Sequence, residues 1–214
     1  MRTALSIVLL VLIALSSANA RETSRILVIG DSLSAAYGID KQRGWVALLQ
    51  QRLAEAANAW QVVNASITGD TTRGGLTRLP AALERENPAV LIIELGGNDG
   101  LRGFAPRQTR ENLARMIDLG RAAGARVLLL GIRLPENYGR DYGEKFHRVY
   151  LELAAEKRVA LVPFFLEGVA ETRAMMQADG IHPDVAAQPR ILDNVWRKLE
   201  PLLQSPGVDR RAAG

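Results

Sequence analysis

The chain has 214 residues, with no cysteine and only two histidines, His147 and His182. Without cysteine there is no thiol nucleophile, no zinc–thiolate site, no cysteine-held cluster and no disulfide. The hydrophobic core alone must hold such a protein together, and the length is sufficient for one ordinary domain. The scarcity of histidine also leaves few residues that could pair with a nucleophile as its base.

The chain also lacks a strong charge, since its formal net charge is +4. Basic residues are spread among acidic ones, and no basic stripe alternates with aromatic residues, which make up 5% of the chain. This composition predicts no nucleic-acid partner. The segment Asp209–Arg211 has the pattern of a loose charged end.

A long hydrophobic run occurs at the amino terminus. Arg2, an apolar run from Ala4 to Leu15 and the small residues of Ala18–Ala20 predict that residues 1–20 are a secretory signal peptide. The run is shorter than the roughly 20 residues that span a bilayer, so an uncleaved anchor is the less favoured alternative. Cleavage would leave residues 21–214 as a single domain, periplasmic or secreted, with no integral membrane association. Losing Arg2 lowers the formal charge from +4 to +3.

Patterns typical of buried strands and amphipathic helices alternate along the rest of the chain. The expected strands are residues 25–30, 61–66, 90–95, 126–132 and 160–163. The expected helices are residues 45–57, a segment through Leu76 and Leu83 that stops before Pro88, and residues 106–123, 144–157 and 191–203. This alternation predicts an α/β fold with a parallel sheet covered on both faces.

Polar segments with glycine follow the first three expected strands: Gly30–Ser32, Thr68–Asp70 and Gly96–Asp99. Parallel sheets bind ligands beyond the carboxyl ends of their strands, so we expect these three loops to converge on one rim. Glycine there allows backbone N–H groups to approach a ligand closely.

Ser32 on this rim, together with Asp179 three residues before His182, supplies the parts of a serine hydrolase. Acyl transfer needs an activated hydroxyl, a base for its proton, and a carboxylate that orients the base. The alternative role for Ser32 is a helix N-cap, which is also favoured for Ser34. His147 is the rival base, but it lies within a helical pattern.

Developing negative charge on the substrate needs hydrogen-bond donors. The Asn98 side chain and the backbone N–H groups of Gly69 and Ser32 are the candidates. As isolated residues, Asn98 and Gly69 would each be interpreted as turn residues.

Four blocks, GDSLS, NASITGDTT, GGND and DGIHP, resemble in this order the SGNH (GDSL) hydrolase superfamily. The four letters of that name fall on Ser32, Gly69, Asn98 and His182. The longer segments VVNASITGDT, ELGGNDGLRGF, IRLPENYG and MMQADGIHP resemble its multifunctional periplasmic thioesterases, lysophospholipases and arylesterases of Gram-negative bacteria. This resemblance extends to about Leu203.

The resemblance implies a flavodoxin-like, three-layer α/β/α fold with five parallel strands. It implies that Ser32 is the nucleophile, His182 the base and Asp179 its partner, with Ser32, Gly69 and Asn98 forming the oxyanion hole. The expected substrates are aryl esters, acyl-CoA and lysophospholipids. The acyl site is expected to include Leu101, Arg102, Gly103, Phe104, Leu134, Pro135 and Ile181. We expect no cofactor, no metal and a monomer.

Three other interpretations stay open. Asp31, Asp70 and Asp99 follow successive strands and could bind Mg²⁺ in a phosphohydrolase. The fold could also serve a non-catalytic lipid carrier. The same triad could belong to a carbohydrate or peptidoglycan O-deacetylase, or to an acyltransferase. An α/β-hydrolase elbow is not expected, because its G-x-S-x-G pattern requires glycine where Ser34 stands.

Overall fold

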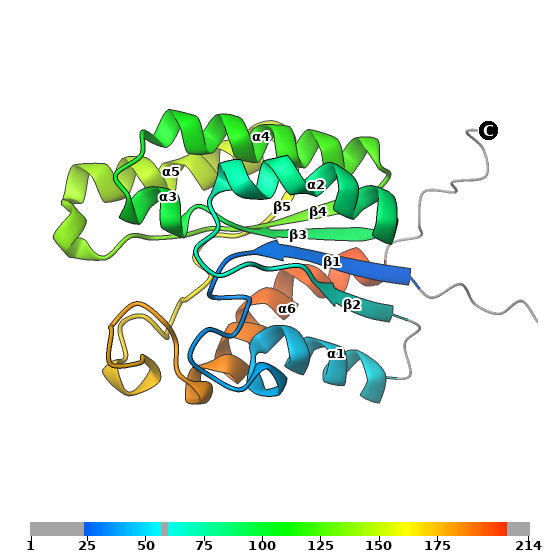
Figure 1. Cartoon of the computed structure of the whole chain (residues 1–214), viewed down its shortest axis with the longest axis horizontal. Helices are drawn as coiled ribbons and strands as arrows, with labels where there is room; N and C mark the ends of the chain where they lie inside the picture. The colour runs from blue at the N-terminus through cyan, green and yellow to red at the C-terminus, as the bar shows by residue number, and fades with distance from the viewer. Residues whose placement is uncertain (1–23, 57–59, 205–214) are drawn as a thin grey trace, which may run out of the picture.

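The computed structural model describes residues 24–56 and 60–204. The predicted signal peptide, residues 1–20, and the charged segment Asp209–Arg211 lie outside the described residues. Five parallel strands form one sheet in the order β2-β1-β3-β4-β5 (Figure 1). This is the flavodoxin-like order, and it confirms the predicted fold class. The strands are β1 (Ser24–Gly30), β2 (Trp60–Asn64), β3 (Val90–Glu94), β4 (Arg126–Leu130) and β5 (Ala160–Val162).

Helices cover both faces of the sheet. On one face α2, α4 and α5 lie side by side, and on the other α1 packs against α6 (Figure 1). The α-helices are α1 (Trp45–Glu55), α2 (Thr72–Glu86), α3 (Gly97–Leu101), α4 (Pro106–Ala122), α5 (Arg140–Lys157) and α6 (Gln188–Gln204). Short 3₁₀ turns are η1 (Lys41–Arg43), η2 (Glu136–Tyr138), η3 (Arg173–Met175) and η4 (Val185–Ala187).

The two central strands, β1 and β3, are enclosed on both faces. Residues 26–29 and 90–93 have no solvent exposure, which explains why both segments are continuous apolar runs. Their parallel register pairs Ile26 with Val90 and ends by placing Gly30 beside Glu94. The carboxyl ends of β1 and β3 therefore lie side by side, and the chain leaves both strands on the same side of the sheet.

The structure corrects several expected boundaries. Of segment 96–99, expected as a loop, residues 97–99 instead belong to the short helix α3, because Gly96 (φ 118°) turns the chain away from β3. Only glycine fits there, since the Tyr150 hydroxyl occupies the place of a Cβ. α5 begins at Arg140 rather than 144, directly after Gly139 (φ 86°). Smaller shifts affect the ends of α1, α6, β2 and β4.

The carboxyl ends and the amino ends of the parallel strands, here called the carboxyl edge and the amino edge of the sheet, carry different parts of the molecule. The segments that follow β1, β2 and β3 gather at the carboxyl edge, whereas β1 begins and α6 ends at the opposite, amino edge (Figure 1). The three polar segments singled out in the sequence therefore meet on one side of the protein.

Candidate active site

Ser32 lies just beyond β1 in a tight turn at the carboxyl edge of the sheet. The turn is closed by hydrogen bonds from Ala35 N–H to the Asp31 carbonyl (2.9 Å) and from Tyr37 N–H to the Ser32 carbonyl (3.1 Å). Ser32 is 8% exposed, so the surrounding residues cover most of it. The fully buried end of β1 thus gives this hydroxyl a fixed position.

The structure brings Ser32, His182 and Asp179 together. The Ser32 Oγ lies 2.9 Å from His182 Nε2, and His182 Nδ1 lies 2.6 Å from Asp179 Oδ2. The other carboxylate oxygen of Asp179 accepts hydrogen bonds from the backbone N–H groups of Ile181 (2.9 Å) and His182 (3.0 Å). This is the hydroxyl–imidazole–carboxylate order that activates a serine.

The same hydrogen bonds keep Asp179 ionised. The His182 backbone N–H, followed by the His182 ring and the Ile181 N–H, lowers the pKa of Asp179 to about 2. The carboxylate is consequently negative at any pH at which the imidazole is neutral. It therefore accepts a hydrogen bond from the Nδ1–H of the neutral ring, which leaves the Nε2 lone pair directed at Ser32.

Gln177 and Tyr37, which the sequence did not single out, hold the imidazole loop in place. The Gln177 side chain donates to the Tyr37 carbonyl (2.8 Å) and to the Pro183 carbonyl (3.0 Å). The Tyr37 ring lies against the His182 ring with 4.5 Å between centroids. The loop after β1 is thereby tied to the loop that carries His182.

Asn98, in the first turn of α3, is oriented by the residue that precedes the serine. Its Nδ2 donates to Asp31 Oδ2 at 3.1 Å. A carboxylate accepts and cannot donate, so Asp31 selects the amide orientation in which the NH₂ group faces it. Burial raises the pKa of Asp31 to about 6, although hydrogen bonds from Leu33 and Asn98 oppose the shift. The second N–H of Asn98 remains for a ligand.

Gly69 lies in the segment after β2, with φ of +78°. A Cβ there would meet no atom closer than 4.0 Å, so glycine serves the backbone conformation rather than close packing. Within residues 24–56 and 60–204, neither the Gly69 nor the Ser32 backbone N–H donates to another protein group. Both are therefore available to stabilise an oxyanion.

Glu94 is a fully buried carboxyl beneath the serine turn. Its Oε2 accepts hydrogen bonds from the Ser34 hydroxyl (2.8 Å) and the Asp31 backbone N–H (3.3 Å). Its Oε1 is buried and has no hydrogen-bond partner among residues 24–56 and 60–204. Burial and the nearby Asp31 charge raise the pKa of Glu94 well above its usual value. Burial and the Asp31 charge thus favour the protonated form of Glu94 in the folded protein.

We expect Glu94→Gln to become more stable relative to the wild type as pH rises, with stability measured as the free energy of unfolding. In the wild type, the Glu94 carboxyl holds its proton more tightly when folded than when unfolded, where its pKa returns to the ordinary value of 4.5. Above that pH the unfolded state binds fewer protons, so the contribution of Glu94 to wild-type stability falls as pH rises. Urea unfolding of both proteins from about pH 5 to 7 measures the shift, and a pH-independent difference would contradict a raised pKa of Glu94.

The three aspartates considered as magnesium ligands have separate partners. Asp31 binds Asn98, Asp70 forms an ion pair with Arg78 (2.8 Å), and Asp99 accepts from the Thr72 backbone N–H (2.8 Å) and hydroxyl. In the described part of the chain, no group of three or more His, Asp or Glu residues could hold a metal ion. The aspartates instead hold the loops of the rim in place.

The rival base, His147, lies elsewhere. It is on α5, half-buried, with Nδ1 3.2 Å from the Ile132 carbonyl, and burial lowers its pKa. Its ring therefore supports the segment after β4 rather than Ser32.

A cavity of about 660 Å³ opens beside Ser32 and His182. Its volume is in the range of small-molecule sites. Of the residues expected at the acyl site, the cavity is lined by Leu101, Leu134, Pro135 and Ile181. Ile132, in the IRLPENYG segment that resembles the family, also lines it. The apolar lining residues that the sequence did not single out for the acyl site are Leu33, Phe164, Leu166, Ala170 and Met176.

Arg102, Gly103 and Phe104 do not line this cavity. α3 ends at Leu101, and Gly103 (φ +71°) then turns the chain toward α4. Arg102 instead donates to the Gly69 carbonyl (3.0 Å), and the Phe104 carbonyl accepts from the Tyr142 hydroxyl (2.8 Å).

Several known proteins are similar to this chain in both sequence and architecture. Residues 28–188 match the model of the GDSL-like Lipase/Acylhydrolase family. The chain is 61% identical over 194 residues to Esterase TesA of Pseudomonas aeruginosa, covering 91% of this chain and 96% of that protein. It is 48% identical over 182 residues to Thioesterase 1/protease 1/lysophospholipase L1 of Escherichia coli K12, covering 83% and 84%. A crystal structure of TesA superposes with a TM-score of 0.82 at 62% identity, covering 84% of this chain and 99% of that one.

Proposed function

The chain belongs to the GDSL-like lipase/acylhydrolase family, and from that premise we propose that it hydrolyses carboxylic esters and thioesters through an acyl-enzyme on Ser32. As a member of this family the protein is an ester hydrolase. The observation that carries the assignment of the residues is the hydrogen-bonded chain from Ser32 Oγ through His182 to Asp179, with distances of 2.9 and 2.6 Å.

In the proposed first half-reaction, His182 Nε2 takes the Ser32 proton as Oγ attacks the acyl carbonyl carbon. The oxyanion accepts hydrogen bonds from the Ser32 and Gly69 N–H groups and from Asn98. The imidazolium, stabilised by Asp179, then protonates the leaving oxygen or sulfur as the acyl bond breaks. In the second half-reaction water attacks the acyl-enzyme, gives its proton to His182, and the proton returns to Ser32 Oγ as the acid leaves.

The cavity supports acyl groups as the part of the substrate that is bound. Its apolar side chains, including Phe164, Leu166 and Met176, would bury methylene groups at about 0.8 kcal/mol for each one. The charged residues Arg133, Glu136 and Glu171 also line it and would contact polar parts of a substrate. We therefore propose acyl-CoA, aryl esters and lysophospholipids as substrate classes.

The setting of the enzyme is part of the proposal. We propose that residues 1–20 are removed on export and that residues 21–214 act as a single-domain monomer, periplasmic or secreted, without a nucleic-acid partner. Among the described residues, no helix has the length and apolarity needed to cross a bilayer.

A series of p-nitrophenyl esters from acetate to palmitate, assayed beside acyl-CoA and lysophospholipid, tests the acyl site. We expect kcat/KM to rise with acyl length until the cavity is filled, because each methylene buried in the transition state adds binding energy. Ala170→Phe, which fills part of the cavity, should lower kcat/KM for long acyl groups about 10-fold and spare acetate.

The matched control is Ala174→Phe, the same change on the exposed turn η3 outside the cavity lining. It should leave the chain-length profile unchanged. Activity confined to acetyl esters would contradict acyl-chain binding and favour the O-deacetylase interpretation. Equal effects of both substitutions would contradict the assignment of the cavity.

A further inference from the structure

The segment that carries Gly69 is a β-turn attached to the end of β1. Its closing hydrogen bond runs from Asp70 N–H to the Ile67 carbonyl (3.0 Å), and Gly69 occupies the third position with φ of +78°. Positive φ at this position is what a type II turn requires. Ile67, the first residue of the turn, donates its N–H to the Gly30 carbonyl (3.0 Å), two residues before Ser32.

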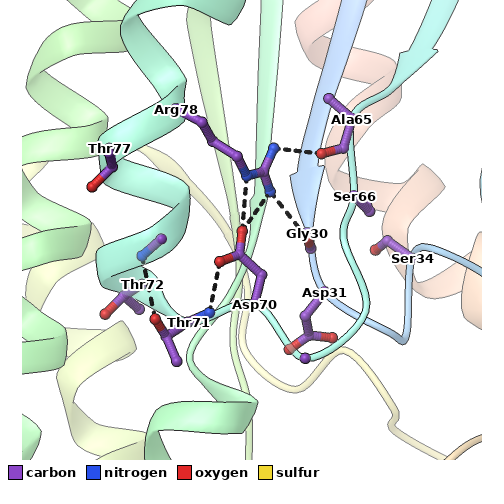
Figure 2. A network of polar contacts seen from close by, with 12 residues as sticks. Gly30, Asp31, Ser34, Ala65, Ser66, Asp70, Thr71, Thr72, Thr77 and Arg78 are labelled. Atoms are coloured by element: carbon purple, nitrogen blue, oxygen red, sulfur yellow. Dashed lines mark hydrogen bonds and ion pairs between the residues drawn. The ribbon is translucent and has the colours of Figure 1, made fainter.

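Arg78 joins the last residue of this turn to the same carbonyl (Figure 2). Its side chain extends from α2, and its Nε lies 2.8 Å from Asp70 Oδ2, with which its Nη2 also forms an ion pair. Nη2 further donates to the Gly30 carbonyl (3.3 Å), and Nη1 donates to the Ala65 carbonyl just after β2. A single guanidinium thus contacts the end of β1, the end of β2 and the Gly69 turn.

The ion pair is enclosed by the start of α2. The side chains of Arg78 and Asp70 are 23% and 11% exposed. Asp70 Oδ1 accepts from the Thr71 N–H (2.9 Å), and it fills the space that a Cβ on Gly74 would occupy. The Arg78–Asp70 ion pair, which we call the clamp, is consequently anchored to helix α2 and not to another loop.

We propose that Arg78 is a positioning residue that fixes the Gly69 N–H relative to the Ser32 N–H in the oxyanion hole. The inference rests on the proposed function, in which both groups bind the oxyanion. A planar guanidinium holds several acceptors at fixed angles, whereas the ammonium of lysine is a point charge on a flexible stem. Lysine would keep the charge beside Asp70 and lose the fixed spacing between the two donors.

The test is Arg78→Lys, assayed with p-nitrophenyl butyrate and with an alkyl trifluoromethyl ketone, which adds to a serine hydroxyl and forms an oxyanion. Removing one oxyanion donor costs about 10²–10³ in rate, and displacing it should cost about 10–10². We expect kcat to fall by that factor with KM changed less than about twofold, and ketone affinity to fall by the same factor as kcat/KM.

Arg85→Lys is the matched control, because Arg85 lies on the same helix and its side chain is 64% exposed. It should leave both readouts unchanged. Unchanged kcat in Arg78→Lys, or a fall in kcat without a matching loss of ketone affinity, would overturn the proposal. If Arg78→Lys does not fold, Asp70→Asn replaces it, with the same coupled loss expected and the same results contradicting it.

The wild-type adduct separates this proposal from the proposed function. A ketone that forms no adduct on wild-type Ser32 would contradict the acyl-enzyme mechanism itself. An adduct of equal affinity in wild type and Arg78→Lys would contradict the clamp alone.

Discussion

Replacing Ser32 by alanine is expected to lower kcat/KM for p-nitrophenyl butyrate by about 10⁶-fold, the scale seen when a serine hydrolase loses its nucleophile. Alanine removes the only oxygen within hydrogen-bond reach of His182 Nε2 among the described residues. The nearby Ser34 hydroxyl cannot substitute, because it is buried and donates to Glu94. Steady-state kinetics on the purified variant measure the loss.

Covalent labelling identifies the nucleophile directly. A fluorophosphonate should label wild type at one site and leave Ser32→Ala unlabelled, with intact-protein mass spectrometry as the readout. Ser34→Ala is the matched control and should keep the label. Stoichiometric active-site labelling of Ser32→Ala would show that another residue is the nucleophile.

Asp179→Asn should lower kcat/KM by about 10⁴-fold without disturbing the loop. The asparagine carbonyl oxygen can still accept the backbone N–H groups of Ile181 and His182, which Asp179 Oδ1 accepts in the wild type. Its NH₂ group would then face His182 Nδ1 and donate to it. The imidazole would carry its proton on Nε2 and could no longer accept one from Ser32.

The matched control is Asp184→Asn, an identical change five residues further along, where the wild-type carboxylate caps η4. It should keep most of the activity. A loss of less than about 10-fold in Asp179→Asn would indicate that the carboxylate does not orient the base.

Periodicity predicted most of the fold, because the apolar runs of β1 and β3 and the helical spacing of α1 and α4 each reflect burial directly. Helix α3 escaped prediction because five residues with two glycines carry no helical pattern. It forms through tertiary contacts, since Asp99 is held by Thr72 and Thr109 from α2 and α4. The helix propensity of these five residues carries no information about partners that are distant in the sequence.

The site was predicted unevenly for a similar reason. Ser32, His182 and Asp179 stand in short blocks whose residue types fit one chemistry, and the structure places them together. The role of Arg78 could not be predicted, because an arginine within a helical pattern is usually a solvated residue. Phe164 and Met176 lie in an irregular segment, where no periodicity tells a cavity wall from ordinary packing.

Because the serine turn and the described ends of the domain lie at opposite ends of the strands, the protein can be attached to a support away from its active site. Ser24 starts β1 one strand length, or roughly 20 Å, from the serine turn. Helix α6, which ends at Gln204, also ends on the side of the sheet where β1 begins (Figure 1). A tag, fusion partner or solid support joined directly at Ser24 or Gln204 would therefore begin on the side of the sheet opposite Ser32. In an immobilised enzyme the cavity beside Ser32 would face the solution. Large or aggregated substrates could then reach it without colliding with the tether.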